Sequence, residues 1–263
     1  MQLEPGWCVI LGASSGFGAA AARALAAAGL DVCGVHLDRK TTRHLAEEVV
    51  KDIEACGRRA RFFNVNAVDP ERCAEVVAAL RDAVGGGPRV RVLLHSLAFG
   101  TLKALVAKEP ADAVSPQQMA MTLTVMATSL VDWAQALRQA DLLERGGRIF
   151  AMTSEGGQRV IPTYGPVGAA KAALESIVRQ LAVELAPLEI AVNALCAGVT
   201  RTPALEKIPG SQRILAAALA RNPRGRLTTP EDVAGALVAL SSPACHWITG
   251  NVIRVDGGEG VAA

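Results

Sequence analysis

Tyr164 and Lys171 have the side-chain types and the spacing for proton chemistry. Tyr164 is the only tyrosine in the 263-residue chain, and Lys171 follows it by seven residues. The Gly165-Pro166 pair predicts that a helix begins directly after the tyrosine, because proline is favoured in a helix's first turn. Seven residues are about two helical turns, so both side chains face roughly the same way. We expect the lysine to make the phenol, with a reference pKa of about 10, a better proton donor. A packed aromatic beside a solvated lysine is the alternative.

A glycine-rich turn near the start of the chain could hold a phosphate. It reads L-G-A-S-S-G-F-G and lies between an apolar run and a helical segment. Glycines there permit a tight turn and a close approach of the backbone to a pyrophosphate, with the helix N-terminus directed at the charge. In this context the turn predicts dinucleotide binding. The predicted contacts are Gly12, Ser14, Ser15, Gly16, Phe17 and Gly18.

Alternating strands and helices must position these residues. Apolar runs predict strands over 7–11, 32–36, 60–65, 90–95, 147–153, 190–195 and 251–255. Helical periods lie over 16–28, 41–56, 70–84, 116–138, 166–185 and 230–240. This alternation predicts the α/β class, with a single doubly wound Rossmann fold and a seven-stranded parallel sheet covered by helices on both faces.

Composition limits the other function classes. Hydrophobic residues make up 51% of the chain and aromatics only 3%, so we expect one domain over 1–263 with an aliphatic core. The net charge of +2 argues against nucleic acid as a partner. The six cysteines are scattered without metal-ligand spacing, and no apolar stretch reaches membrane-spanning length. We therefore expect a soluble cytoplasmic protein without a metal site or a membrane partner.

The chain resembles the short-chain dehydrogenase/reductase family over essentially its whole length. The G-x-x-x-G-x-G turn, the seven predicted strands, the tyrosine and lysine helix, and the closing V-D-G-G at 255–258 carry the resemblance. In most members the tyrosine lies four residues before the lysine. Here that position is Val167, which cannot donate a proton.

The Y-x6-K spacing and four segments resemble the enoyl-acyl carrier protein reductase branch more closely. The segments are A-M-T-S-E-G-G-Q-R-V-I-P-T-Y at 151–164, A-A-K-A-A-L-E-S at 169–176, H-S-L-A-F-G at 95–100 and N-A-L-C-A-G-V-T-R-T at 193–202. The resemblance implies reduction of a trans-2-enoyl thioester by a hydride from NADPH or NADH. Tyr164 would donate a hydrogen bond to the thioester oxygen, and Lys171 would hold the nicotinamide ribose. The carrier would be coenzyme A or an acyl carrier protein.

Ser154 is the third predicted catalytic residue. Ten residues before the tyrosine, enoyl reductases often carry a second tyrosine, and this chain has Ser154 instead. Its position matches the serine that polarises the carbonyl in ketone-reducing relatives. The alternative is a serine that caps the end of a strand. Thr124 matches the place of an asparagine in ketone reductases and stays outside the predicted catalytic set.

The end of the second predicted strand should select between NADPH and NADH. An acidic side chain there would bind the ribose hydroxyls and repel a 2′-phosphate. The strand ends at His36, and Asp38, Arg39 and Lys40 follow. Because His36 is not acidic and two cations follow, we expect NADPH to be favoured, with contacts from His36, Arg39 and Lys40. A solvated turn is the alternative.

The resemblance implies further cofactor contacts after three other strands. Asn66 would offer a donor and an acceptor to adenine, and His95 would fix the end of its strand rather than act as an acid. The implied contacts are Asn66, Ala67, Ser96, Leu97, Ala98, Gly198, Thr200 and Thr202.

Residues 199–226 predict a substrate lid. Two apolar pieces broken by Pro209-Gly210 could close over an acyl chain; an ordinary helical excursion is the alternative. The family resemblance also implies a homotetramer. Two other functions stay open: a carbonyl reductase or alcohol dehydrogenase acting on a 3-oxoacyl or other ketone, and a nucleotide-sensing protein without catalysis.

Overall fold

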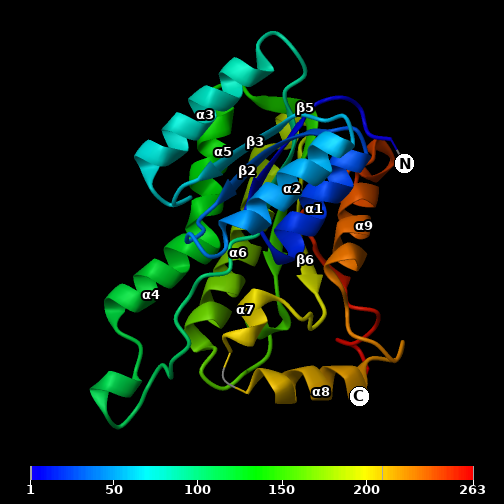
Figure 1. The fold of residues 1–263 in the computed structure, drawn as a ribbon. Coiled ribbons are helices and arrows are strands. Elements are labelled where there is room, and N and C mark those ends of the chain that lie inside the picture. Colours follow the sequence, from blue (N-terminus) through cyan, green and yellow to red (C-terminus); the bar gives the residue numbers. More distant parts are fainter. Residues whose placement is uncertain (1, 209, 263) are drawn as a thin grey trace.

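Seven parallel strands form the centre of the protein in a computed structural model that describes residues 2–208 and 210–262. Their order in the sheet is β3-β2-β1-β4-β5-β6-β7, which confirms the predicted doubly wound sheet (Figure 1). The strands are β1 (Trp7–Leu11), β2 (Asp31–His36), β3 (Ala60–Asn64), β4 (Val90–His95), β5 (Leu143–Thr153), β6 (Ala191–Ala197) and β7 (Val252–Val255).

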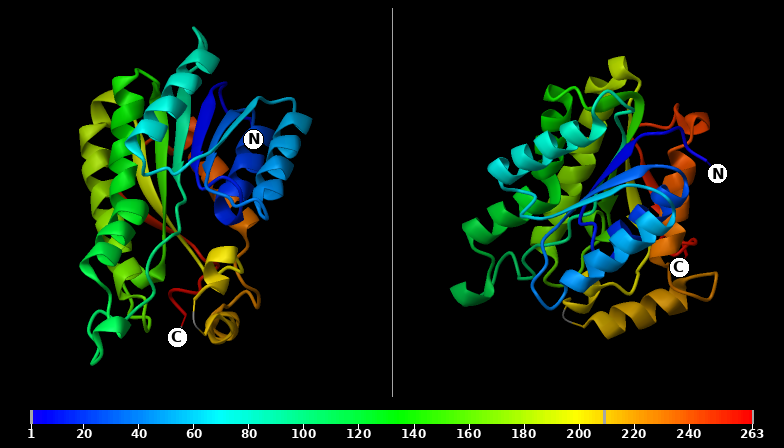
Figure 2. Two further views of the ribbon diagram at one scale, coloured as in Figure 1. Left: turned by 60° about the vertical axis from the view of Figure 1, so that its left-hand side comes forward. Right: turned by 45° about the horizontal axis from the view of Figure 1, so that its top comes forward.

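Helices cover both faces of this sheet. They are α1 (Gly16–Ala27), α2 (Arg43–Ala55), α3 (Pro70–Val84), α4 (Pro116–Leu123), α5 (Ser129–Gln139), α6 (Gly165–Glu184), α7 (Pro203–Glu206), α8 (Ser211–Arg221) and α9 (Pro230–Leu240). Helices α3, α5 and α6 lie on one face of the sheet and α1, α2 and α9 on the other (Figure 2). An apolar core fills the space between the sheet and each of these two layers. The buried side of α1 is almost entirely alanine and glycine, which permits close helix packing.

Local signals explain why several helices begin where predicted. Asp69 caps α3 by accepting two backbone N–H groups, and a proline follows it in the first turn. Ser115 and Thr229 form capping boxes at the starts of α4 and α9. Such caps satisfy N–H groups that otherwise have no partner in the first turn.

Most elements lie within two residues of the predicted bounds, and two differ by more. The single helix expected over 116–138 is interrupted by a π-helical turn, Thr124–Thr128, between α4 and α5. A π turn contains one residue more than an α-helical turn, and hydrophobic periodicity does not reveal this insertion. Such π turns occur often at functional sites. Strand β5 also begins earlier than expected, at Leu143, which pairs with Val90 across an irregularity in the register.

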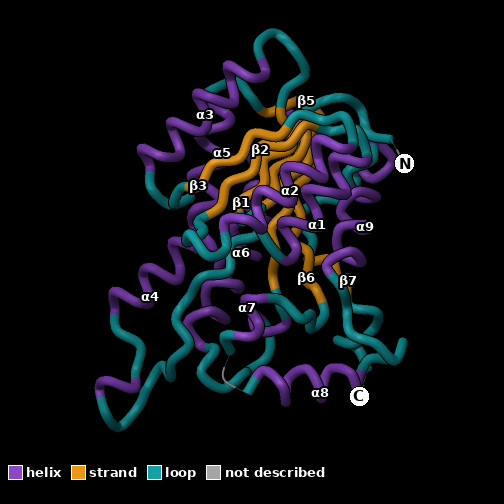
Figure 3. The backbone as a smooth tube through the Cα atoms, in the orientation of Figure 1, coloured by secondary structure: helices purple, strands orange, loops and turns teal. Residues whose placement is uncertain are grey.

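The segment predicted as a lid folds into α7 and α8. Both helices lie beyond the ends of the strands, near the carboxyl end of β6 (Figure 3). In parallel α/β sheets, ligands bind outside the carboxyl ends of the strands. Within the described residues, no helix combines the length and the apolar character needed to cross a membrane.

Candidate active site

Tyr164 lies directly before α6 and faces the loop that follows β5. Its hydroxyl is 3.4 Å from the Ser154 Oγ, so the structure brings these two predicted residues together. The tyrosine ring packs on Gly156, where an added Cβ would overlap the ring. The loop therefore contacts the tyrosine twice: Gly156 packs against one side of the ring, and the Ser154 hydroxyl lies beside the phenol hydroxyl.

The acidity of Tyr164 differs from the expectation. Burial raises the pKa of the phenol, and the hydrogen bond with Ser154 only partly opposes this effect. The expectation that the lysine would lower this pKa was wrong for this arrangement, because the shift comes from desolvation and from Ser154, and Lys171 does not contribute to it. Tyr164 consequently stays protonated at neutral pH and has a proton available for a hydrogen bond.

Lys171 is buried on α6, and its Nζ donates to the Met152 carbonyl oxygen at 2.7 Å. Burial lowers the pKa of the ammonium to about 8, while the Glu175 carboxylate acts in the opposite direction. Glu175 lies one turn further along the same helix. It is also buried, and it accepts a hydrogen bond of 2.7 Å from the Thr153 hydroxyl. This carboxylate, which the sequence analysis missed, joins the end of β5 to α6.

His95 is fully buried at the end of β4 and does not act as an acid here. Its Nε2 lies 2.9 Å from the Ser129 Oγ, so it ties the strand to α5 as predicted. Burial and the Lys171 charge lower its pKa to about 3. The imidazole is therefore neutral at physiological pH.

Val167 occupies the place of the usual family tyrosine and belongs to the apolar interior. It packs with Met126 and Ala170, and Tyr164 and Val125 lie at the edge of this cluster. Met126 and Val125 come from the π-helical turn that Thr124 begins. A valine at this position thus fills space beneath the candidate site, and the only described phenol is that of Tyr164.

The glycine-rich turn has the geometry of a phosphate cradle. Gly12 has a φ of 89°, and an added Cβ would lie 2.5 Å from the Ser96 carbonyl oxygen. A Cβ at Gly18 would overlap the Gly12 carbonyl. Ser15 makes no side-chain cap to α1, so the first N–H groups of that helix stay available to an anion. These residues fit a dinucleotide pyrophosphate.

The loops after β4 and β6 reach the same turn. Ser96 donates its N–H to the Leu11 carbonyl oxygen at 2.9 Å, and the Thr202 methyl group lies 3.5 Å from the Cβ position of Gly16. Thr202 also caps α7. Thr200 is buried, and its hydroxyl donates to the Gly198 carbonyl oxygen at 3.0 Å. The Thr200 hydroxyl is therefore engaged within its own loop.

The segment after β2 presents a carboxylate rather than cations to the glycine turn. His36 is buried, and its Nδ1 lies 2.8 Å from the Asp38 carboxylate, while Arg39 and Lys40 are exposed. Burial raises the pKa of Asp38, but hydrogen bonds with Thr42 and His36, together with the nearby Ser14 hydroxyl, outweigh it and hold the pKa below its usual value. From the sequence, the contacts expected in this segment were His36, Arg39 and Lys40 rather than Asp38.

The predicted adenine contacts have mixed surroundings. Asn66 is exposed, and its side-chain oxygen accepts the Val68 N–H in a local turn. Ala67 is buried, and its carbonyl oxygen accepts from the Trp133 indole at 2.8 Å. Leu97 is partly buried and Ala98 is exposed beside the turn.

Comparison with known proteins agrees with this geometry. Residues 12–259 match the family model described as enoyl-(acyl carrier protein) reductase. The 1-cyclohexenylcarbonyl-CoA reductase of Streptomyces collinus is 31% identical, covering 97% of this chain and 87% of its own length. The 3-oxoacyl-[acyl-carrier-protein] reductase of Thermotoga maritima is 30% identical, covering 98% and 99%.

One similar solved structure contains a bound nucleotide. The enoyl-(acyl-carrier-protein) reductase of Anaplasma phagocytophilum in complex with NAD is 26% identical, with a TM-score of 0.83 over 100% of this chain and 94% of that chain. The three relatives differ in their named substrates but are all named as reductases. The chain therefore belongs to the short-chain dehydrogenase/reductase family of nicotinamide-dependent oxidoreductases, near its enoyl-acyl carrier protein reductase branch.

Proposed function

We propose that the protein reduces the trans-2 double bond of an enoyl thioester with a hydride from a reduced nicotinamide nucleotide. The observation that carries this proposal is the position of its phenol. Tyr164 reaches Ser154 from seven residues before the lysine, while Val167 fills the position used by most of the family. The likeness to reductases of an enoyl-CoA and an enoyl-acyl carrier protein supports it.

The chemistry requires a donor to an oxygen that becomes negative. A bound reduced nicotinamide supplies the hydride to the β-carbon, and charge develops on the thioester oxygen as an enolate. Tyr164 would donate a hydrogen bond to that oxygen, and Ser154 would be a second donor. One such donor typically stabilises the transition state by about 3 kcal/mol. Lys171 would add positive potential from beneath the site.

Apolar side chains near Tyr164 suit an acyl chain. The Leu105 side chain packs against Gly165, where an added Cβ would lie 2.7 Å from Leu105 Cγ. Leu105 is 55% exposed, and Val160, just before the tyrosine, is 99% exposed. These exposed apolar groups would be covered by a bound acyl chain and by residues 199–226, which we propose as its lid.

We propose NADH as the cofactor, although the sequence favoured NADPH. The change rests on Asp38, whose carboxylate accepts from Thr42 and whose pKa is lowered by Ser14 of the glycine turn, whereas Arg39 and Lys40 are exposed. A carboxylate at this place accepts hydrogen bonds from ribose hydroxyls and repels a 2′-phosphate. The NAD complex of the Anaplasma relative is consistent with this choice.

A carbonyl reductase or alcohol dehydrogenase is the second candidate. Ser154 and Tyr164 are close enough to share one carbonyl oxygen, and the Thermotoga relative is named for a 3-oxoacyl substrate. A nucleotide-sensing protein without catalysis is the third. It would bind the dinucleotide and turn over neither class of substrate.

One assay separates the three candidates. Oxidation of NADH or NADPH is followed with crotonyl-CoA and with acetoacetyl-CoA, and with the corresponding carrier-protein thioesters. Turnover of the crotonyl substrates alone is the expected result. Turnover of acetoacetyl substrates alone would make the protein a carbonyl reductase. Nucleotide binding without turnover of either would remove both enzymatic proposals.

We also propose a cytoplasmic homotetramer. Two exposed apolar side chains motivate the assembly: Val183 on α6 is 72% exposed, and Trp247, shortly before β7, is 88% exposed. Side chains of this kind are often buried between copies of a chain.

A further inference from the structure

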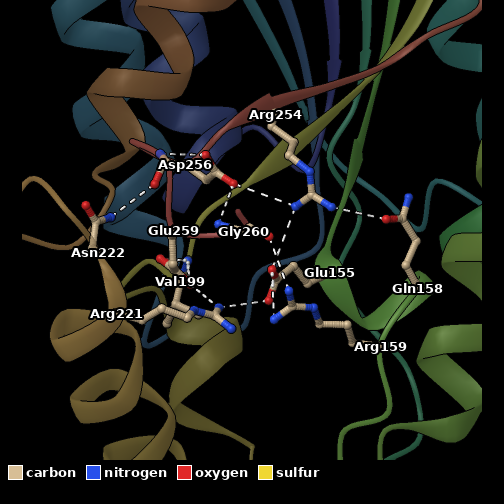
Figure 4. A network of polar contacts seen from close by, with 11 residues as sticks. Glu155, Gln158, Arg159, Val199, Arg221, Asn222, Arg254, Asp256, Glu259 and Gly260 are labelled. Atoms are coloured by element: carbon tan, nitrogen blue, oxygen red, sulfur yellow. Dashed lines mark hydrogen bonds and ion pairs between the residues drawn. The ribbon is translucent and has the colours of Figure 1, made fainter. Parts of the chain in front are cut away.

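Arg221, the last residue of α8, joins three segments around the candidate site. Its Nη2 lies 2.9 Å from Glu155 Oε2 and 3.1 Å from Glu259 Oε1 (Figure 4). Glu155 belongs to the loop after β5, and Glu259 belongs to the segment after β7. One guanidinium therefore holds the end of α8 against both.

Glu155 lies between two residues that contact the candidate proton donor. Ser154 precedes it and places its hydroxyl 3.4 Å from that of Tyr164. Gly156 follows it and packs against the tyrosine ring. A displacement of Glu155 would therefore move both the support of the ring and the partner of its hydroxyl.

Glu259 connects Arg221 to the loop after β6. Its side chain is only 2% exposed, and its carboxylate accepts the Val199 N–H at 3.2 Å. Val199 lies between Gly198 and Thr200, two of the predicted cofactor contacts. The contacts of Arg221 thus extend to the loop after β5 and the loop after β6.

The ion pairs of Arg221 are partly shielded from water. Loss of one partner should therefore destabilise this part of the structure. The Arg221 side chain is 25% exposed and that of Glu155 is 20% exposed. Arg254 and Arg159 approach Glu155 only at 3.7 and 3.6 Å. Removing a partner from a buried pair leaves the other charge without compensation, and Arg221 makes the short contact.

We propose that Arg221 is a positioning residue that latches the lid helix α8 to the loop carrying Ser154 and, through Glu259, to the loop after β6. It touches no reacting atom and acts through Glu155 and Glu259. Only the description of α8 as part of an acyl-chain lid rests on the proposed function. The latch itself can be measured without any substrate.

Hydrogen exchange tests the latch directly. In Arg221→Gln, exchange of α8 and of residues 154–157 should be faster by about fivefold or more, because local opening loses its restraint. Arg213→Gln is the matched control, since Arg213 is exposed on the same helix and the charge change is the same. Exchange in residues 154–157 that matches wild type in Arg221→Gln would overturn the proposal. Equal acceleration in Arg213→Gln would overturn it as well.

Kinetics supply a second test if Arg221→Gln is too unstable to use. Glu155→Gln and Arg221→Gln should each lower kcat/KM for crotonyl-CoA by about tenfold, and the double variant should lose little more, because the residues act as one unit. Arg221→Lys, which keeps a charge at the end of α8, should recover most of the rate. Additive losses or no recovery would overturn the proposal. An inactive wild type would instead refute the proposed function, with hydrogen exchange still deciding the latch.

Discussion

At the scale of single residues, the protonated phenol of Tyr164 carries the proposed chemistry. Burial keeps it protonated, so the role we propose for it is to donate a hydrogen bond to a developing enolate oxygen. Tyr164→Phe should lower turnover of crotonyl-CoA by at least about tenfold through the loss of that donor. NADH binding, measured by fluorescence titration, should be unchanged because the glycine turn is intact. Wild-type turnover in the variant would refute the assignment.

The charge of Lys171 sets the expected pH dependence. Its pKa of about 8 lies below the ordinary value, so the ammonium loses its proton as the pH rises through about 8. The positive potential near the substrate oxygen is then lost, and kcat/KM should fall on the alkaline side.

Glu175→Gln tests whether deprotonation of Lys171 causes the fall of kcat/KM at alkaline pH. Removing the carboxylate removes an influence that raises the Lys171 pKa, so the falling limb should move to lower pH. The amide oxygen of the glutamine can still accept the hydrogen bond from the Thr153 hydroxyl. The variant therefore removes the negative charge and keeps this structural contact. A pH profile of kcat/KM identical to that of wild type would exclude Lys171 as the titrating group.

Asp38 is expected to decide the nucleotide preference. Asp38→Ala should raise the ratio of NADPH to NADH activity by about tenfold, because the repulsion of a 2′-phosphate is removed. Arg39→Ala is the matched neighbour, and its side chain is exposed. The measurement is the ratio of kcat/KM with NADPH to kcat/KM with NADH in each variant. If Arg39→Ala changes this ratio more than Asp38→Ala does, Arg39 rather than Asp38 sets the nucleotide preference, as the sequence suggested.

At the scale of elements, the loop after β5 requires glycine to leave room for the tyrosine ring. Gly156→Ala would place a methyl group inside the Tyr164 ring, so ring or loop must move. Activity should fall by about tenfold or more, because a small displacement of a catalytic group is costly.

Gly235→Ala is the control for this substitution. Gly235 lies inside α9 with nothing within 4 Å of its Cβ position. The alanine should therefore stabilise the fold by about 0.5–1 kcal/mol and leave activity unchanged. Thermal unfolding and kcat measured on both variants make the comparison. An active Gly156→Ala enzyme would show that the loop does not support the ring.

At the scale of the whole molecule, the apolar surface near β7 predicts assembly. Trp247→Ser should shift the protein toward smaller species in light scattering after size exclusion, because a large apolar contact is lost. Val106→Ser is the control, since Val106 is equally exposed at 88% in the loop between β4 and α4. A monomeric wild type would contradict the proposed tetramer.

The sequence predicted the fold almost to the residue in several elements. The bounds of β1, β4, α3 and α9 agree with the prediction. These elements have local signals, such as the apolar run of β4 and the Asp69 and Thr229 caps. Such signals lie within a few residues of each other and can therefore be read directly from the sequence. The π turn at 124–128, which packs against α6, was not predicted because hydrophobic periodicity does not reveal an extra residue in a helical turn.

For the site, the sequence by itself determined the residue types: a glycine turn, one phenol, and a lysine two turns later. Only the tertiary structure decided which groups meet. It joined Asp38 to His36 and Thr42 while leaving Arg39 and Lys40 exposed, and brought Glu155 against Arg221 from 66 residues away. Contacts over such separations depend on the order of the strands and on the end of the sheet where the loops converge. Neither is encoded in the local spacing of residues along the chain.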